Sequence, residues 1–331
     1  MRVSYDELVT VLTGALKNLG MEAARADRCA RLFADTDRDG VYSHGLNRFP
    51  RFVRMIQKGV VDVRAHAVPI DAYHGIERWN GQGGPGNLNA LACMQRAIEL
   101  GEGHGIGCVA LSNTNHWMRG GTYGWQAAEA GVIGICWTNT LPNMPPWGAV
   151  EPRVGNNPLI VAIPHPPAHV VLDMAMSQFS VGGLATYRSR GERLPVPGGH
   201  DVNGQLTDDP AALEESRRLL PVGFWKGSGL SLVLDLAAAL LSGGLATFQI
   251  SPEPERETSL SQIFIAIRLP SDPAASAQLV DGVLEYTLRP APTGERTRYP
   301  GERTLQTRRR NTVEGIPVDD AVWKSVLALS G

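Results

Sequence analysis

Residues 159–175, LIVAIPHPPAHVVLDMA, contain two apolar runs rich in β-branched residues, and only HPPAH separates them. Such a short linker cannot hold the crossover that parallel strands need, so 159–164 and 170–175 are predicted to pair as an antiparallel hairpin. Similar apolar runs at 107–113, 132–139 and 262–269 alternate with helical stretches. This alternation indicates an α/β fold, in which a mixed sheet has helices packed on its faces. The helices are expected at residues 88–101, 122–130, 177–190, 226–242 and 272–288.

The N-terminal part carries a helical pattern without such strands. Ser4 and Glu7 form a capping box ahead of leucines that recur every four residues, and Gly20 ends this helix. A second helical pattern runs from about residue 22 toward Gly40.

These elements divide the chain into two regions. Residues 1–70 are expected to form a small helical domain, joined by a C-terminal helix at 312–330, and residues 71–311 to form the α/β region. Residues 193–222 are rich in Gly, Pro and Asp and are predicted to be a long surface loop, which is usually functional or mobile.

Composition excludes several classes of protein. The 331 residues are 43% hydrophobic and 19% charged with a formal net charge of -2, which is typical of a globular protein and argues against a nucleic-acid partner. The most apolar stretch, 230–241, is interrupted by Asp235 and is too short to cross a bilayer, so no membrane partner is expected. The acidic N-terminus and the dispersed cysteines favour a cytoplasmic protein with buried free thiols, without disulfides or a zinc site.

The stretch GVYSHGLNRFPRF at residues 40–52 places a histidine and an arginine four positions apart. In a helical turn, His44 and Arg48 would share one face. Arg48 could then hold a substrate carboxylate with two parallel hydrogen bonds while His44 gives a proton to a neighbouring carbonyl oxygen. For an isolated HxxxR, a structural histidine beside a surface arginine is the more common explanation.

His116 directly follows the predicted strand at 107–113, and ligands tend to bind at the carboxyl ends of strands in α/β sheets. Gly120 and Gly121 would let the backbone approach a flat ring closely. A lone histidine in such a place is more often a hydrogen-bonded structural residue. The sequence contains no HxH, HExxH or His/Cys cluster, so no metal site is expected.

Two glycine-rich stretches suggest nucleotide binding at first sight. GQGGPG at 81–86 has the letters of the dinucleotide fingerprint, but it follows a weak strand, contains Pro85 and has no acidic residue about twenty positions later, so we interpret it as a chance match. In GFWKGSG at 223–229, Lys226 precedes the second and third glycines, unlike the lysine of a phosphate-binding loop. Lys226 and the free N–H groups at the start of its helix could still bind an anion, although a lysine that bounds a buried helix fits the spacing equally well.

The segments VYSHGLNRFPRF, HGIGCVALSNTNHWMRGGTYGWQAAEAG, GICWTN, NPLIVAIP, GFWKGSG and SQIFIAI follow one another along the chain. Together they resemble the type-2 malate/L-lactate dehydrogenase family over nearly the whole sequence. The resemblance implies an NAD(P)-dependent oxidoreductase with a largely antiparallel, non-Rossmann cofactor domain, and a homodimer with the active site near the partner subunit. It further implies NADH as the preferred cofactor, with NADPH possible, and reduction of a 2-keto sugar acid at C2. Dehydrogenation of malate, L-lactate or ureidoglycolate and reduction of a cyclic imine acid stay open as alternatives.

The resemblance also assigns roles to individual residues. His44 would protonate the substrate oxygen, Ser43 and Arg48 would line the substrate site, and His116 would lie near the nicotinamide. A binding protein without catalysis, or a structural assembly protein, would not need this combination. Arg303 stands where the resemblance leads us to expect an acidic residue, which leaves the choice between NADH and NADPH open. The cofactor-binding residues implied are His169, Asp173, Met174, Ala175, Trp225, Lys226, Gly301, Glu302 and Arg303.

Overall fold

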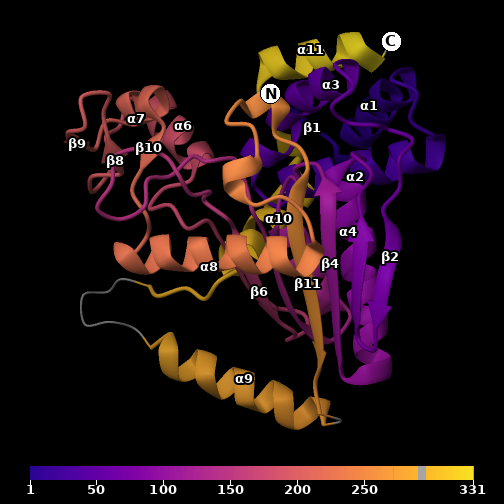
Figure 1. Ribbon diagram of the computed structural model, residues 1–331. Helices are drawn as coiled ribbons and strands as arrows, with labels where there is room; N and C mark the ends of the chain where they lie inside the picture. The colour runs from indigo at the N-terminus through magenta and orange to yellow at the C-terminus, as the bar shows by residue number, and fades with distance from the viewer. Residues whose placement is uncertain (271, 290–295, 331) are drawn as a thin grey trace.

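A seven-stranded sheet forms the centre of the computed structural model, which describes residues 1–270, 272–289 and 296–330 (Figure 1). Neighbouring strands are antiparallel except β3 and β4, which are parallel. The expected mixed, largely antiparallel sheet is therefore confirmed. In order across the sheet, the strands are β2 (Val68–Tyr73), β3 (Ile76–Asn80), β4 (Ile106–Thr114), β11 (Leu260–Arg268), β5 (Val132–Thr138), β6 (Leu159–Ile163) and β7 (Val170–Met174).

Helices cover both faces of this sheet, because the side chains of each strand point alternately to opposite sides. In β4, Val109 and Leu111 belong to an apolar cluster with α4 (Gly86–His104) and α5 (Gly121–Glu129). Cys108 and Ala110 belong to a cluster with α8 (Trp225–Ser242) on the other face. Figure 1 shows α8 crossing in front of the strands. In the described parts of the chain, none of the helices has both the length and the apolar composition of a membrane span. The helices predicted for this region are all present, as α4 (Gly86–His104), α5 (Gly121–Glu129), α6 (Val181–Ser189), α8 (Trp225–Ser242) and α9 (Pro273–Thr287).

The predicted hairpin is formed by β6 and β7, with Leu159 opposite Met174. β7 is an edge strand, so one side of its backbone is free to meet other segments of the chain. There, the Val171 N–H donates a hydrogen bond to Pro300 O at 2.9 Å. All four cysteines are free and buried, as expected.

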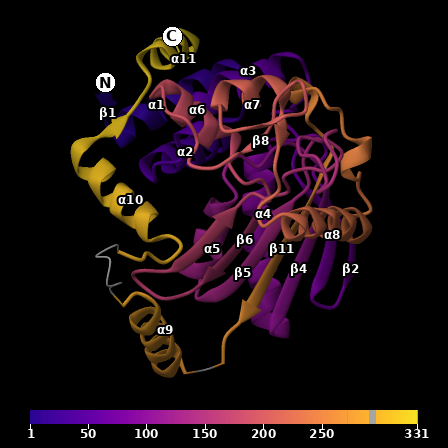
Figure 2. The ribbon, with the colours of Figure 1, turned by 90° about the vertical axis from the view of Figure 1, so that its left-hand side faces the viewer.

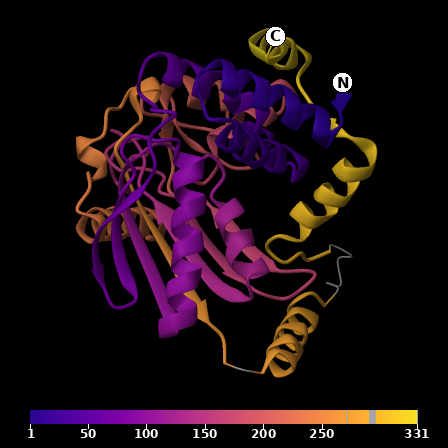
Figure 3. The same ribbon diagram turned by 90° about the vertical axis from the view of Figure 1, so that its right-hand side faces the viewer.

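The N-terminal helices pack around an apolar cluster that is separate from the clusters on the sheet. The first helix starts as predicted, since Ser4 Oγ accepts a hydrogen bond from the Glu7 N–H at 3.1 Å. The C-terminal helix contributes Trp323 and Val326 to the same cluster, and Figures 2 and 3 show both chain ends on this side of the molecule. The helices of this part are α1 (Tyr5–Asn18), α2 (Ala23–Arg38), α3 (Phe49–Gln57) and α11 (Asp320–Ser330).

The C-terminal helix is shorter than the predicted 312–330. α10 (Glu302–Glu314) ends at Gly315, whose φ of 83° lies in the left-handed region. β12 (Ile316–Pro317) follows and pairs antiparallel with β1 (Arg2–Val3). This strand pairing divides the predicted helical stretch in two.

The prediction of a long surface loop at 193–222 is wrong. These residues form a three-stranded sheet and a short helix, which lie beside the main sheet together with α6 (Figure 1). Leu184, Leu194, Leu213 and Leu219 are buried together at the centre of this lobe. Its strands are only two residues long, so no periodic pattern marks them in the sequence. The elements are β8 (Gly199–His200), β9 (Leu206–Thr207), α7 (Pro210–Ser216) and β10 (Arg218–Leu219).

The segment before GQGGPG is a regular strand, contrary to the prediction of a weak one. β3, the GQGGPG turn and α4 lead to β4, which runs parallel to β3. The turn packs against the protein itself, because Asn115 Nδ2 donates hydrogen bonds to Gly83 O at 2.7 Å and to Gly84 O at 2.9 Å. A Cβ on Gly86 would lie 2.1 Å from Asn115 O. These contacts give the glycines a role in packing and favour the interpretation as a chance match.

Candidate active site

The HxxxR stretch forms two short 3-10 turns, η1 (Tyr42–His44) and η2 (Leu46–Arg48), instead of the α-helical turn that its spacing suggests. The buried Asp37 carboxylate fixes the break between them. It accepts a hydrogen bond from the Leu46 N–H at 2.6 Å, and a Cβ on Gly45 would lie 2.1 Å from its Oδ1. Burial raises the pKa of Asp37 well above its ordinary value, against the lowering effect of that N–H group.

Two imidazole rings meet next to a hydroxyl group. The centroids of His44 and His116 lie 5.9 Å apart with their planes inclined by 25°, and a hydrogen bond of 2.8 Å joins Ser43 Oγ to His44 Nδ1. His116 Nδ1 accepts a hydrogen bond from the Met118 N–H at 3.0 Å, so the neutral ring carries its proton on Nε2. The structure thus brings together three of the residues proposed from sequence.

Both rings are held in the neutral form. Burial, followed by the positive charges of Arg48 and Arg119, lowers the pKa of His44 from 6.5 to about 4. Burial lowers the pKa of His116 well below its ordinary value, and the charge of Arg48 acts in the same direction. Both histidine residues keep part of their surface accessible to solvent, so a ligand can approach them. We call Ser43, His44, Arg48 and His116 the His44 cluster.

Arg48 already faces a carboxylate of the protein. Arg48 Nη2 lies 3.6 Å from Glu257 Oε2, and Arg51 Nη2 lies 3.3 Å from the same oxygen. Glu257 is only 4% exposed, and burial together with the charge of Arg51 lowers the pKa of Arg48 to about 10. Sequence reasoning missed Glu257, which lies 206 positions from Arg51 in the chain. The signal for Arg51 was present, because it lies one helical turn after Arg48 in NRFPRF.

A second set of charged side chains acts on the cluster, because the charge of Arg119 contributes to the lowered pKa of His44. Arg119 Nη1 donates to Asp39 Oδ2 at 2.6 Å, and Arg308 donates to both oxygens of Asp39 at 2.7 Å. The Arg308 guanidinium also lies 4.5 Å from the ring centroid of Trp125. Burial alone would raise the pKa of Asp39, but Arg308 and Arg119 hold it below its ordinary value. This network joins α2, α5 and α10, and nothing in the sequence pattern indicated it.

Gly120 and Gly121 do not lie open to a flat ring, so that prediction is wrong. A Cβ on Gly120 would lie 2.4 Å from Ile160 Cδ1, and the Gly121 N–H donates to Asp173 Oδ2 at 2.9 Å. The two glycines let the start of α5 approach β6 and β7.

The residues expected to bind the cofactor gather along β7. Asp173 is exposed there, and Met174 and Ala175 follow it at the end of the strand. His169 is instead buried at 7% exposure, with Nδ1 accepting a hydrogen bond from the His165 N–H at 2.9 Å.

The C-terminal cofactor segment, Gly301 to Arg303, lies against this same strand. Its place follows from the hydrogen bond between Pro300 and β7 described above. Glu302 is buried and forms an ion pair with Arg296, whereas Arg303 is exposed. Arg303 therefore places an exposed positive charge beside β7, the edge strand of the sheet.

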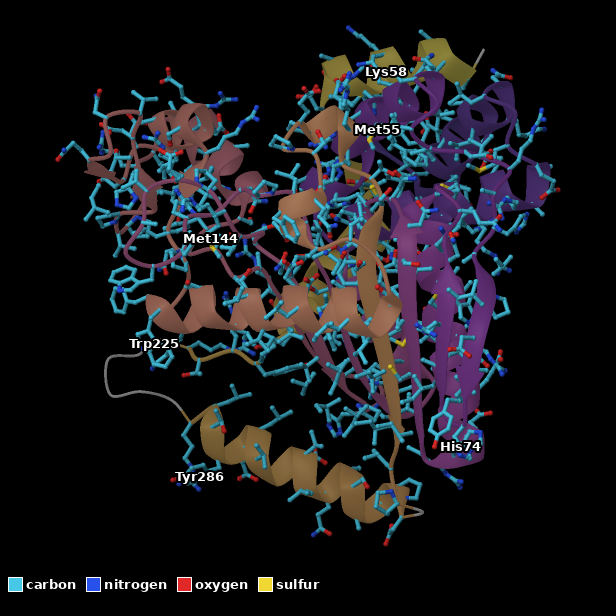
Figure 4. All side chains as sticks on the ribbon, in the orientation of Figure 1. Met55, Lys58, His74, Met144, Trp225 and Tyr286 are labelled. Carbon is cyan, nitrogen blue, oxygen red and sulfur yellow. The ribbon has the colours of Figure 1, made fainter. Side chains whose placement is uncertain are left out.

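The start of α8 reaches the other end of β7. The Val222 N–H donates to Met176 O at 2.8 Å, which joins the two segments. Trp225 is 66% exposed and Lys226 is exposed beside it; Figure 4 shows Trp225 at the outer end of α8. We call β7, the start of α8 and residues 301–303 the β7 flank. In the described ranges of the chain, no group of three or more His, Cys, Asp or Glu side chains is arranged to hold a metal ion.

Residues 3–327 match the family model described as malate/L-lactate dehydrogenase. The chain belongs to this family. One relative, the 2,3-diketo-L-gulonate reductase of Shigella boydii, is 48% identical over 334 aligned positions, which cover 99% of this chain and 100% of the relative. The family and this relative make the chain an oxidoreductase, as expected from the resemblance.

Solved structures of the family share the fold. The malate dehydrogenase of Entamoeba histolytica superposes with a TM-score of 0.93 at 25% identity and covers 100% of this chain and 97% of its own. The delta1-piperideine-2-carboxylate reductase of Pseudomonas syringae gives a TM-score of 0.87 at 28% identity, with 99% of both chains covered. Enzymes with different substrates thus share this architecture, so substrate choice depends on individual side chains.

Proposed function

We propose that the chain reduces the C2 carbonyl of a 2-keto sugar acid, with 2,3-diketo-L-gulonate as the substrate. The observation that carries this proposal is the meeting of two neutral imidazoles and two arginines in the His44 cluster and beside it. The full-length likeness to 2,3-diketo-L-gulonate reductases supports the choice of substrate. A nicotinamide cofactor, when bound, supplies the hydride that the carbonyl carbon accepts.

His44 supplies the proton for the carbonyl oxygen in this proposal. Its Nδ1 is engaged by Ser43, so Nε2 is the nitrogen that faces the substrate. In the unliganded protein the ring is neutral, because burial and the arginine charges disfavour imidazolium. A bound carboxylate would offset the charge of Arg48, and negative charge developing on the substrate oxygen would favour the protonated ring further. His44 therefore gains its proton when the substrate is in place.

Arg48 and His116 orient the substrate. The planar guanidinium of Arg48 matches a carboxylate with two parallel hydrogen bonds, which fixes the keto acid relative to His44. His116 carries its proton on Nε2 and can donate it to an oxygen atom between the two rings.

The β7 flank suits a nicotinamide dinucleotide. It offers the exposed Asp173 for a ribose hydroxyl, the exposed Trp225 for an aromatic base and the Lys226 ammonium for a phosphate. We propose NADH as the preferred cofactor. NADPH is the second candidate, because a surface depression beside Gly301 is lined by Arg298, Arg303 and Arg310, and arginines of this kind bind phosphate.

The protein is further proposed to act as a homodimer in the cytoplasm. α9 stands away from the rest of the molecule in Figures 1 to 3, and it exposes Leu279 at 69%, Val283 at 56% and Tyr286 at 72%. A second copy is the partner most suited to cover an apolar face of this kind. Val283→Asp should therefore convert a dimer to a monomer in sedimentation experiments. The buried free thiols favour a reducing compartment.

The function is tested by measuring oxidation of NADH and NADPH with a substrate panel at matched concentrations. The panel contains 2,3-diketo-L-gulonate, pyruvate, oxaloacetate and a cyclic imine acid. We expect the highest kcat/KM with 2,3-diketo-L-gulonate. A higher value for the cyclic imine or for oxaloacetate would move the chain to another reaction of the family, and no oxidation with any member would refute a reductase of these acids.

A further inference from the structure

Glu257 lies in a short segment that is tied to α3 by charged contacts. The segment contains η4 (Pro254–Arg256) and precedes β11. Arg51 donates a hydrogen bond to Pro254 O as well as lying 3.3 Å from Glu257. Farther along α3, Arg54 and Lys58 both pair with Glu255. Two carboxylates of one segment thus meet two separate sets of cations on or next to α3, since Arg48 directly precedes this helix and Lys58 directly follows it.

The carboxylates of Glu255 and Glu257 differ in how strongly solvent screens their charges. The Glu255 side chain is 40% exposed, and its partners Arg54 and Lys58 are about half exposed, so solvent screens their charges. The Glu257 side chain is 5% exposed and its partners are 22% and 18% exposed, so its charge acts strongly on its surroundings. Arg48 belongs to the His44 cluster, so its contact with Glu257 at 3.6 Å places this charge set there. The charges of Arg48 and Arg51 both act to lower the pKa of His116.

The charges around the cluster can be counted. Arg48 and Arg51 are positive, Glu257 is negative, and the rings of His44 and His116 are neutral before substrate binds. The proton that His44 gains with the substrate passes on to the substrate oxygen, so it is not counted here. The remaining cation that acts on His44, Arg119, belongs to the separate set of charges formed with Asp39 and Arg308 and is not counted here. Among Arg48, Arg51 and Glu257, one positive charge is therefore left over. A single substrate carboxylate neutralises this charge, whereas a dicarboxylate leaves one negative charge uncompensated in a buried place.

We propose that Glu257 determines specificity by restricting the site to substrates with one carboxylate. This inference rests on the proposed function, because it assumes that Arg48 binds the carboxylate of a 2-keto acid. Glu257 does this by occupying the side of Arg48 and Arg51 on which a second substrate carboxylate would be bound. Like-charge repulsion then disfavours oxaloacetate, while a sugar acid presents uncharged hydroxyl groups that can accept hydrogen bonds from Arg51.

The test compares Glu257→Gln with the matched control Glu255→Gln. Both variants remove a carboxylate from the same segment and keep a hydrogen-bonding side chain of similar shape, but only the first removes charge beside Arg48. The measurement is kcat/KM for oxaloacetate and for 2,3-diketo-L-gulonate with a saturating reduced cofactor. Glu257→Gln should raise the oxaloacetate-to-sugar-acid ratio roughly 10- to 100-fold, mainly through a lower KM for oxaloacetate. Glu255→Gln should leave the ratio within about twofold of the unaltered protein.

A charge-compensating variant separates this effect from a loss of packing. Arg51→Gln in the Glu257→Gln background restores the count of one positive charge, so the ratio should return toward its original value. If Glu257→Gln alone does not fold, Arg51→Gln alone is measured instead. This variant lowers the net charge of the site by one, so the ratio of kcat/KM for oxaloacetate to that for the sugar acid should fall below its value in the unaltered protein. An unchanged ratio in the variants that fold, or a Glu255→Gln effect as large as that of Glu257→Gln, overturns the proposal. Absence of activity with every 2-keto acid in the unaltered protein would instead contradict the proposed function.

Discussion

The side chains of the His44 cluster are already paired within the protein, whereas Trp225, Lys226 and Arg303 of the β7 flank face solvent. Ser43 is bonded to His44, His116 to the backbone, and Arg48 lies against Glu257. On the flank, Trp225 is 66% exposed and Lys226 is exposed beside it. The difference indicates that the cluster is held in position before any ligand arrives, while the flank gains its contacts on binding. Substitutions in the cluster should therefore strongly affect turnover or the KM for the keto acid, and those on the flank should mainly affect cofactor affinity.

The largest effect is expected for His44→Ala. Removal of the proton donor should lower kcat about 10²- to 10⁴-fold while the KM for the keto acid changes little. His74→Ala is the control, because His74 lies in the exposed turn between β2 and β3 and Figure 4 shows it far from Met55 on α3. Near-normal turnover of His44→Ala in steady-state assays would mean that another group delivers the proton.

Arg48→Lys should raise the KM for the keto acid roughly tenfold, because an ammonium cannot reproduce the forked contact of a guanidinium with a carboxylate. Arg54→Lys serves as the control, since Arg54 is half exposed on α3, the helix that follows Arg48, and pairs with Glu255. Equal KM values for the two variants would show that Arg48 does not bind the carboxylate of the keto acid.

The pH dependence of the reverse reaction tests the state of His44. Oxidation of the alcohol needs the neutral ring as base, and burial with the arginine charges lowers its pKa to about 4. The neutral form then persists as pH falls, so kcat/KM for oxidation should stay level down to about pH 5 and fall only near pH 4. A decline that already begins near the ordinary histidine pKa of 6.5 would show that the free protein does not disfavour imidazolium.

The smallest effect is expected on the flank. Lys226→Ala should raise the KM for the reduced cofactor about two- to tenfold, with little change in kcat, because an exposed charge is screened by solvent. The effect should shrink further at high salt. Lys324→Ala on α11 is the control, and a fall in kcat for Lys226→Ala without a change in cofactor KM would argue against this placement of the phosphate.

Much of the sheet could be predicted because its strands carry a local signal. The short linker between 159–164 and 170–175 determines the hairpin by itself, and the apolar runs of β4, β5 and β11 are long enough to be recognised. The lobe at 193–222 has no such signal, since its core consists of single leucines brought together from distant positions.

The candidate site could likewise be predicted only where its residues are neighbours in the sequence. His44 and Arg48 are neighbours in sequence and could be paired by spacing, although Asp37 and Gly45 shape the turn differently from the helix assumed. Glu257 meets Arg48 only because the segment before β11 folds back onto α3. Contacts between elements so far apart in the chain leave no spacing pattern to detect.

The most direct test of the account is a crystal structure of the protein with reduced cofactor and oxamate, a 2-keto acid analogue that is not reduced. We expect the oxamate carboxylate on Arg48, its carbonyl oxygen within hydrogen-bond distance of His44 Nε2, and the nicotinamide beside His116 with the rest of the cofactor along β7. A nicotinamide bound away from both imidazoles, or an oxamate carboxylate held by residues other than Arg48, would contradict it.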